Sequence, residues 1–113
     1  DGGEEAVEAF NEALEKCPNH LELDQEQRAL AAQAFFGRAR AHFRQGHWQA
    51  ALDDARRSLD FAPWGLDAMC CEALSLKELG QIEPARARLG LVLLKDPSNK
   101  VAKNALAAMK RTL

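Results

Sequence analysis

The sequence has no tyrosine and few β-branched residues. Aromatic residues make up 6% of its 113 positions. The only β-branched residues are Val7, Ile82, Val92, Val101 and Thr112. Because strands favour β-branched and aromatic side chains, this composition disfavours a sheet and favours helices. The length suits one domain with a single contiguous core.

An excess of one charge sign is also lacking. Fifteen Lys and Arg stand against seventeen Asp and Glu, for a formal net charge of -2. Such a balance creates no long-range field that would gather nucleic acid or an anionic membrane surface. The longest apolar run, residues 89–94, is interrupted by Gly90 and is far shorter than the roughly 20 residues that cross a bilayer. We therefore expect neither a nucleic-acid partner nor a membrane segment.

Cysteines are few and do not form a recognisable motif. The three present, Cys17, Cys70 and Cys71, make an odd number and include no C-x-x-C pair. No Asn-x-Ser/Thr glycosylation acceptor occurs either. These features favour a reducing compartment, so we expect a cytoplasmic or nuclear protein. We expect the thiols to be small buried hydrophobic groups.

Glycine-rich phosphate loops and metal-ligand clusters are missing. The seven glycines form neither G-x-G-x-x-G nor G-x-x-x-x-G-K-[ST]. His20, His42 and His47 have no Cys or carboxylate partners at spacings that build a set of four ligands. We therefore expect no cofactor and no metal.

Catalytic side-chain pairs are equally hard to assemble. The neighbouring carboxylates at Asp53 and Asp54, like Glu4 with Glu5, are expected to be solvated or capping charges. Ser58 has no nearby histidine in the sequence that could activate it as a nucleophile, and the same holds for Ser75. We expect no catalytic residues in this chain and no enzyme activity.

What the sequence does contain is an internal repeat of 34 residues. Several identities fall into line when the chain is shifted by that distance. The matched pairs are Ala34 and Ala68, Ala39 and Ala73, Gly46 and Gly80, Ala51 and Ala85, Leu59 and Leu93, and Pro63 and Pro97.

The repeated residues have defined structural uses. Gly46 and Gly80 follow helical patterns and can adopt the left-handed conformation that ends a helix and turns tightly into the next. Pro63 and Pro97 can end the second helix of each pair, because proline cannot continue a helix. The repeated alanines would let antiparallel helices approach closely. The repeat therefore predicts pairs of packed helices.

This pattern resembles the tetratricopeptide repeat family, a 34-residue helix-turn-helix unit with small residues at positions 8 and 20, Gly near 15 and Pro at 32. With Ala32 as position 1, these are Ala39, Ala51, Gly46 and Pro63. The resemblance implies an all-α helical solenoid of about two and a half repeats plus a capping helix. The expected parts are the second helix of a truncated first repeat (1–20), a second repeat (21–65), a third repeat (66–99) and a C-terminal capping helix (100–113).

Two features depart from the family pattern. Position 7, usually Leu, is Arg38 in one repeat and Glu72 in the next. Pro18 and Pro63 are 45 residues apart, 11 more than the repeat, and the excess is rich in helix formers. We therefore expect a prolonged first helix over residues 23–45. Such a lengthened helix is similar to the repeat domains of large immunophilins and of the aryl-hydrocarbon-receptor-interacting protein.

The resemblance also implies a concave groove lined by the first helix of each repeat. In this register the groove-facing positions include Gly37, Cys71 and Glu78. The residues predicted to bind a partner are Gln33, Phe36, Arg40, Phe43, Arg44, Asp67, Cys70, Leu74 and Lys77.

Arg40 and Arg44 are four residues apart and so share one helix face, where they could hold an acidic peptide. The alternative is that both arginines are solvated, or paired with neighbours such as Asp67 and Glu78. A redox-sensitive or covalent-ligand surface at Cys70 and Cys71 is a further alternative, with Lys77 as the only Lys, Arg or His within the adjacent turn.

Members of the family that bind chaperones hold the carboxylate terminus of heat-shock proteins with a clamp of Asn, Lys and Arg. Gly37, Asp67 and Cys71 stand at the matching positions here. We therefore expect an adaptor that binds a protein or peptide, similar to a co-chaperone in role, with a partner other than the usual heat-shock tail.

Two alternatives concern what surrounds the domain. It could be the C-terminal recruiting part of an immunophilin-type peptidyl-prolyl isomerase whose catalytic domain lies upstream. It could also self-associate, because Val7, Phe10 and Leu14 lack a partner helix in the truncated first repeat.

Overall fold

A computed structural model of the chain describes residues 24–111. This part consists of α-helices and contains no strand, which confirms the all-α prediction for the described residues. The expected helix within residues 1–20, with its apolar residues Val7, Phe10 and Leu14, lies outside the described part. In chain order the helices are α2 (Gln25–Arg44), α3 (Trp48–Phe61), α4 (Leu66–Glu78), α5 (Ile82–Lys95) and α6 (Lys100–Arg111).

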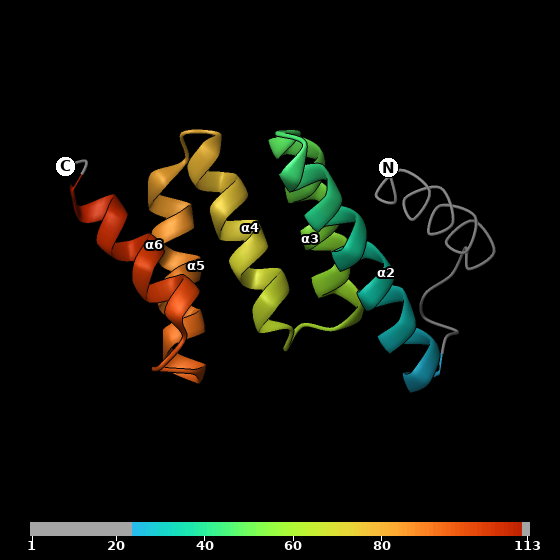
Figure 1. Cartoon of the computed structure of the whole chain (residues 1–113). Helices are drawn as coiled ribbons and strands as arrows, with labels where there is room; N and C mark the ends of the chain where they lie inside the picture. Colours follow the sequence, from blue (N-terminus) through green and yellow to red (C-terminus); the bar gives the residue numbers. More distant parts are fainter. Residues whose placement is uncertain (1–23, 112–113) are drawn as a thin grey trace.

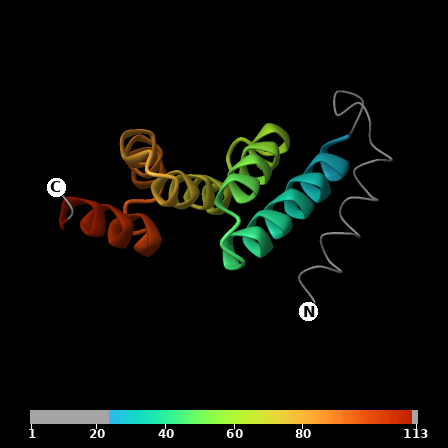
Figure 2. The same ribbon diagram turned by 90° about the horizontal axis from the view of Figure 1, so that it is seen from above.

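The helices run up and down in a row from α2 to α6 (Figure 1). Each helix packs against the next, and α4 also contacts α2 and α6. Seen from above, α3 and α5 lie on one side of the row, while α2 and α6 lie on the other (Figure 2). The contacts of α4 with both α2 and α6 bring these three helices together on one face.

Helix α2 is the longest described helix, with 20 residues. It begins with a capping box, in which the backbone N–H of Gln27 donates to Asp24 Oδ1 at 2.8 Å and the backbone N–H of Asp24 donates to Gln27 Oε1 at 3.0 Å. This reciprocal cap places the start of α2 about two turns before Ala32, where the 34-residue unit would begin it.

The turns between helices confirm the predictions for the repeated glycines and prolines. Gly46 and Gly80 have φ angles of 81° and 85°, and they are the described residues with positive φ. Helix α3 ends two residues before Pro63, and α5 ends two residues before Pro97. Local sequence signals therefore determine where these helices stop.

Small and apolar side chains form the core. The repeated alanines at positions 39, 51, 73 and 85 are all fully buried. The largest cluster spans α3 to α6 and includes Leu52, Leu89, Val92 and Met109, each at most 2% exposed. Burial of each such side chain contributes about 1.5–3 kcal/mol relative to leaving it in water.

The prediction that Asp54 is a solvated or capping charge was wrong. Its side chain is only 4% exposed, because it lies on the face of α3 that packs against α2. There it accepts two hydrogen bonds from the guanidinium of Arg38, at 2.7 Å from Nε and 2.6 Å from Nη2. The neighbouring Asp53 is exposed and accepts a hydrogen bond from Gln49. Glu4 and Glu5 lie outside the described residues.

The next helix pair contains a related ion pair with the charges exchanged, in which the carboxylate is buried and the arginine is partly exposed. Glu72 of α4, with its side chain 3% exposed, lies 2.8 Å from Arg88 Nε of α5. Arg88 follows Glu72 by the same 16 residues that separate Asp54 from Arg38. Glu72 also accepts a hydrogen bond from Arg56 of α3 at 3.1 Å, so one carboxylate joins both helix pairs.

Candidate functional site

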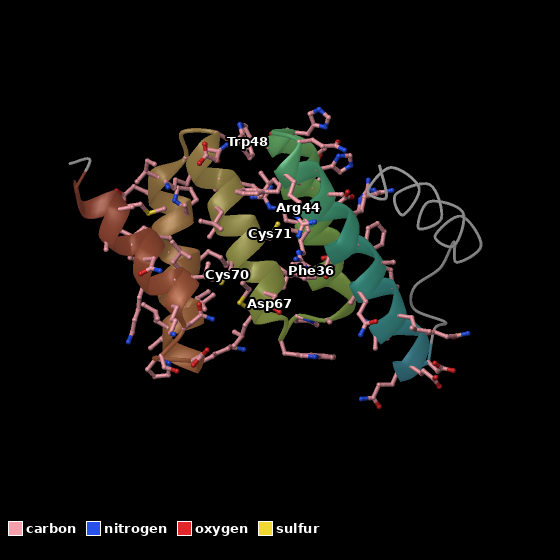
Figure 3. All side chains as sticks on the ribbon, in the orientation of Figure 1. Phe36, Arg44, Trp48, Asp67, Cys70 and Cys71 are labelled. Atoms are coloured by element: carbon pink, nitrogen blue, oxygen red, sulfur yellow. The ribbon has the colours of Figure 1, made fainter. Side chains whose placement is uncertain are left out.

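Helices α2 and α4 and the start of α6 enclose a groove of about 460 Å³, here called the main groove. Figure 3 shows Phe36 and Arg44 on α2 across from Cys70 and Cys71 on α4. The residues lining it are Phe36, Arg40, Phe43, Arg44, Asp67, Cys70, Cys71, Leu74, Asn99 and Val101.

The structure brings together seven of the nine residues predicted to bind a partner. Gln33 lies instead beside a second pocket. Lys77 is half-buried near the C-terminal end of α4 and lines neither of these two hollows. The seven that line the main groove are Phe36, Arg40, Phe43, Arg44, Asp67, Cys70 and Leu74.

Two lining residues, Asn99 and Val101, were missed by the sequence prediction. A signal for Val101 was present, since it follows Gln33 and Asp67 at successive intervals of 34 residues and so takes the same repeat position. The side-chain oxygen of Asn99 accepts a hydrogen bond from the backbone N–H of Ala102 at 3.0 Å. Asn99 therefore caps the start of α6, and this hydrogen bond fixes the orientation of its side chain.

Arg40 and Arg44 are exposed and carry the positive charge of the main groove. Within residues 24–111, neither guanidinium has a carboxylate oxygen within 4.0 Å, so the expected alternative of pairing with Asp67 or Glu78 does not occur. The Arg40 guanidinium lies 5.7 Å from the centre of the Phe36 ring, within the range of a cation–π contact. Among the described residues, both cations are therefore without a carboxylate partner.

Apolar side chains form much of the remaining lining. The Phe43 ring meets the Trp48 ring edge to face, with 4.9 Å between the ring centres. This contact holds Phe43 beside Arg44 at the end of α2. Leu74 and the partly buried Phe36 line the same groove from α4 and α2. The main groove therefore combines anion-binding groups with an apolar surface.

The two groove cysteines are buried, as expected from their residue type, and free of disulfides. Burial raises the pKa of the Cys71 thiol to about 11, while the Ser75 hydroxyl and the Arg40 charge oppose only part of that rise. Burial, together with the Asp67 and Asp96 charges, also raises the pKa of Cys70. Both thiols are therefore protonated at neutral pH, which makes them poor nucleophiles.

The described residues were compared with the requirements of a metal site and of a membrane-spanning helix. Between residues 24 and 111, no three His, Cys, Asp or Glu side chains form a group able to hold a metal ion. None of the helices in that range is long and apolar enough to span a bilayer.

No model of a known protein family matches the chain. The chain is 28% identical over 110 residues to sperm-associated antigen 1 of Mus musculus. This match covers 97% of the chain but only 11% of that protein, so the chain spans about a tenth of its relative.

Two solved structures share the fold. The Hsp90 co-chaperone Cns1 from Saccharomyces cerevisiae superposes with a TM-score of 0.71 at 18% identity, over 97% of this chain and 38% of that one. The Arabidopsis OM64 TPR domain superposes with a TM-score of 0.69 at 19% identity, over 98% of this chain and 99% of that one. The chain has the tetratricopeptide repeat fold, as predicted. The finer resemblance to immunophilins stays a prediction.

Proposed function

We propose that this tetratricopeptide repeat domain is a non-catalytic protein-interaction module whose main groove binds an acidic peptide segment of a partner protein. The observation that carries the proposal is the pair of arginines, Arg40 and Arg44, without carboxylate partners among the described residues. They stand one helical turn apart above an apolar surface. We also propose that the chain is divided into repeats at 21–65 and 66–99, followed by a capping helix at 100–113.

Each part of the groove has a definite use in this function. A guanidinium presents a planar fork of donors that matches a carboxylate, and Arg40 is already oriented over Phe36. Phe36, Phe43 and Leu74 offer apolar contact area to the side chains beside the acidic group. A volume of about 460 Å³ is within the range of ligand sites and would hold a few residues of an extended peptide.

The proposed ligand differs from the usual heat-shock tail. Cns1 is described as an Hsp90 co-chaperone, and its fold is shared here. In this chain, however, Asp67 lines the main groove where the clamp has a lysine, so it would repel a terminal carboxylate at that point. Cys71 and Gly37 lack the donors that the clamp takes from Arg and Asn. The acidic group is therefore expected at Arg40 and Arg44.

A second candidate is a recruiting domain of an immunophilin-type peptidyl-prolyl isomerase with its catalytic domain upstream. The length of α2, which begins about two turns before the repeat, favours it. In that protein the main groove would perform the same task. The two protonated thiols in the groove fit a reducing compartment, the cytoplasm or nucleus.

Fluorescence polarisation with a labelled peptide tests the proposal. The probe is an eight-residue peptide of alternating Glu and Leu, and a heat-shock C-terminal peptide serves as a second probe. We expect a Kd in the micromolar range for the first probe and a loss of tenfold or more in the double variant Arg40→Ala, Arg44→Ala.

The matched control is the double variant Lys95→Ala, Lys103→Ala, which removes two exposed charges from outside the groove. Equal weakening in the control would show that only net charge matters and would contradict the proposal. No binding up to about 1 mM, equivalent to about -4 kcal/mol, would also contradict it. Tight binding of the heat-shock probe through the same arginines would overturn the exclusion of that tail.

A further inference from the structure

The main groove does not end at Asp67. Beyond it lies a second pocket of about 250 Å³, here called the side pocket, between α2, the end of α3 and the start of α4. Phe36 and Asp67 line both hollows, so the two adjoin at these residues. The side pocket is lined by Ala29, Ala32, Gln33, Phe36, Ser58, Ala62, Trp64, Gly65, Leu66, Asp67 and Ala68.

Among the described residues, Asp67 is the one charged side chain lining the side pocket. It is exposed, and no Lys, Arg or His nitrogen of residues 24–111 lies within 4.0 Å of its carboxylate. As an acidic residue in the first turn of α4, it interacts favourably with the helix N-terminus. That contact explains why an acid is tolerated there but leaves its outer oxygens open to a ligand.

Trp64 supplies the second feature of the side pocket. It lies in the connection between α3 and α4 and is 63% exposed, the largest exposure of an aromatic side chain among the described large hydrophobic residues. A tryptophan face attracts an ammonium or guanidinium group more strongly than the other aromatic side chains. The side pocket thus has a carboxylate and an indole in one small hollow, which is a combination suited to a cation.

We propose that the side pocket is a subsite for a lysine or arginine of the same peptide that binds in the main groove. This inference rests on the proposed function, and it predicts that the peptide ligand carries both acidic and basic residues. Its basic residue would pair with Asp67 and lie against Trp64, while its acidic residues would pair with Arg40 and Arg44. Figure 3 shows Arg44 and Asp67 apart from one another, with Phe36 and the two cysteines labelled between them, so the two charge signs are separated.

The position of the arginines on α2 determines the spacing in the ligand. Phe36 lies at the level of Asp67, since both line the two hollows, and Arg40 and Arg44 follow it by four and eight residues. With a rise of about 1.5 Å per residue, the arginines lie about 6 Å and 12 Å further along the helix. An extended peptide covers about 3.3 Å per residue, so its acidic groups should stand about two and four residues from the basic one.

A peptide series tests the inference. The reference peptide carries Leu and Glu only, and its relatives carry one Lys at two, three, four or six residues from the last Glu, in either chain direction. Each has a partner with Ala in place of Lys. For the wild-type domain we expect one direction and a spacing of two to four residues to lower the Kd three- to tenfold relative to the Ala peptide. The same gain at every spacing, or at none, would overturn the inference.

Variants then show which residue of the protein causes the higher affinity for the Lys peptide. In Asp67→Asn we expect the advantage of Lys over Ala to vanish, while binding of the acidic part still depends on Arg40 and Arg44. The matched control is Asp53→Asn, an exposed aspartate on α3 that lines neither hollow, and it should keep the advantage. If D67N strengthens both peptides equally, Asp67 only repels the acidic segment and the inference is wrong.

Tryptophan fluorescence gives an independent readout. The protein has two tryptophans, so the variant Trp48→Phe leaves Trp64 as the sole emitter. The Lys peptide should change its emission, and the Ala peptide should not. Equal changes with both peptides would contradict the inference. If no acidic peptide binds in any experiment, the proposed function itself fails; if acidic peptides bind without a Lys advantage, only this inference fails.

Discussion

The two helix pairs, α2 with α3 and α4 with α5, share one backbone plan and differ in the sign of their charges. The first pair buries Arg38 of its first helix against Asp54 of its second, and the other pair buries Glu72 against Arg88. The groove-lining faces differ in the same way. Helix α2 contributes Arg40 and Arg44, whereas α4 contributes Asp67 and two thiols.

At this position of the repeat, the sign of the buried charge differs between the two helix pairs, and each charge has a partner of the opposite sign. A charge that stands where the family usually has Leu is tolerated because its partner stands 16 residues away on the facing helix. Glu72 has two arginine partners, one from each helix pair. Asp54 depends mainly on Arg38, since its other neighbours, the His42 imidazole and the Arg57 guanidinium, lie 3.6 Å and 3.9 Å away.

The largest expected effect comes from removing Arg38. Arg38→Met should lower the free energy of unfolding by about 3–5 kcal/mol, because it leaves Asp54 buried without its main partner. Arg88→Met should lower the free energy of unfolding by less, because Glu72 retains its contact with Arg56 at 3.1 Å. Urea unfolding followed by circular dichroism measures both. Removing the whole pair in Arg38→Met, Asp54→Leu should restore most of the loss. Equal losses in the two single variants would refute the difference between the helix pairs.

A second expectation concerns the thiols on the α4 side of the groove. Since burial raises the pKa of Cys71 from 9.0 to about 11, its thiolate fraction at pH 8 should be about a hundredfold below that of an exposed thiol. Iodoacetamide labelling of the folded double variant Cys17→Ser, Cys70→Ser, in which Cys71 is the remaining thiol, should be slower by that factor and should accelerate in urea.

The same shift has a consequence for stability. The raised pKa of Cys71 means that its stabilising contribution is present below pH 9 and is lost as the pH rises toward about 11, because only the unfolded chain releases the proton in that range. Cys71→Ala should flatten this part of the pH profile of stability. An unchanged slope between pH 9 and 11 would contradict the assignment.

Exchanging the charges of the first pair would sharpen the comparison. The double variant Arg38→Glu, Asp54→Arg gives the first helix pair the charge order of the second. We expect most of the stability to return, with a remaining deficit of about 1–2 kcal/mol, because the guanidinium introduced at position 54 would then face His42 and Arg57. A double-mutant cycle by urea unfolding measures the recovery. Complete recovery would show that these two neighbours have no influence.

The smallest effects are expected where the helix pairs are alike. Gly46→Ala and Gly80→Ala should each cost about 1 kcal/mol, because both glycines have positive φ and meet no close contact at an added Cβ. Gly90→Ala is the matched control, since it lies inside α5 with open space around it. The free energy of unfolding of this control should rise by about 0.5–1 kcal/mol, because alanine has the higher helix propensity. Thermal unfolding separates the opposite signs.

Local patterns made much of this fold predictable. The 34-residue spacing indicated the glycine turns, the proline stops and the buried alanines. The resemblance to the tetratricopeptide repeat family, applied in the same register, anticipated most of the lining of the main groove, because it implies which positions of each first helix face the groove. It would also have found Val101 if it had been extended past residue 99.

Other features could not be read from those patterns. Asp53 and Asp54 are adjacent and chemically identical, yet one is exposed and the other is buried against Arg38. The pairing of 38 with 54 depends on the distance between two helices, which composition does not report. The side pocket likewise forms only where α2, the α3–α4 connection and α4 meet at Trp64.

From the order of residues alone, the helical class, the repeat length and the ends of the helices follow, because they depend on backbone propensities and on contacts within a few positions. Only the packed molecule shows which charges are neutralised and which are left open to a partner. Burial and ion pairing are long-range properties that arise when separate helices come within a few ångströms. Arg38 and Arg40 illustrate this, since they are two residues apart on one helix, and one is locked to a carboxylate while the other faces the groove.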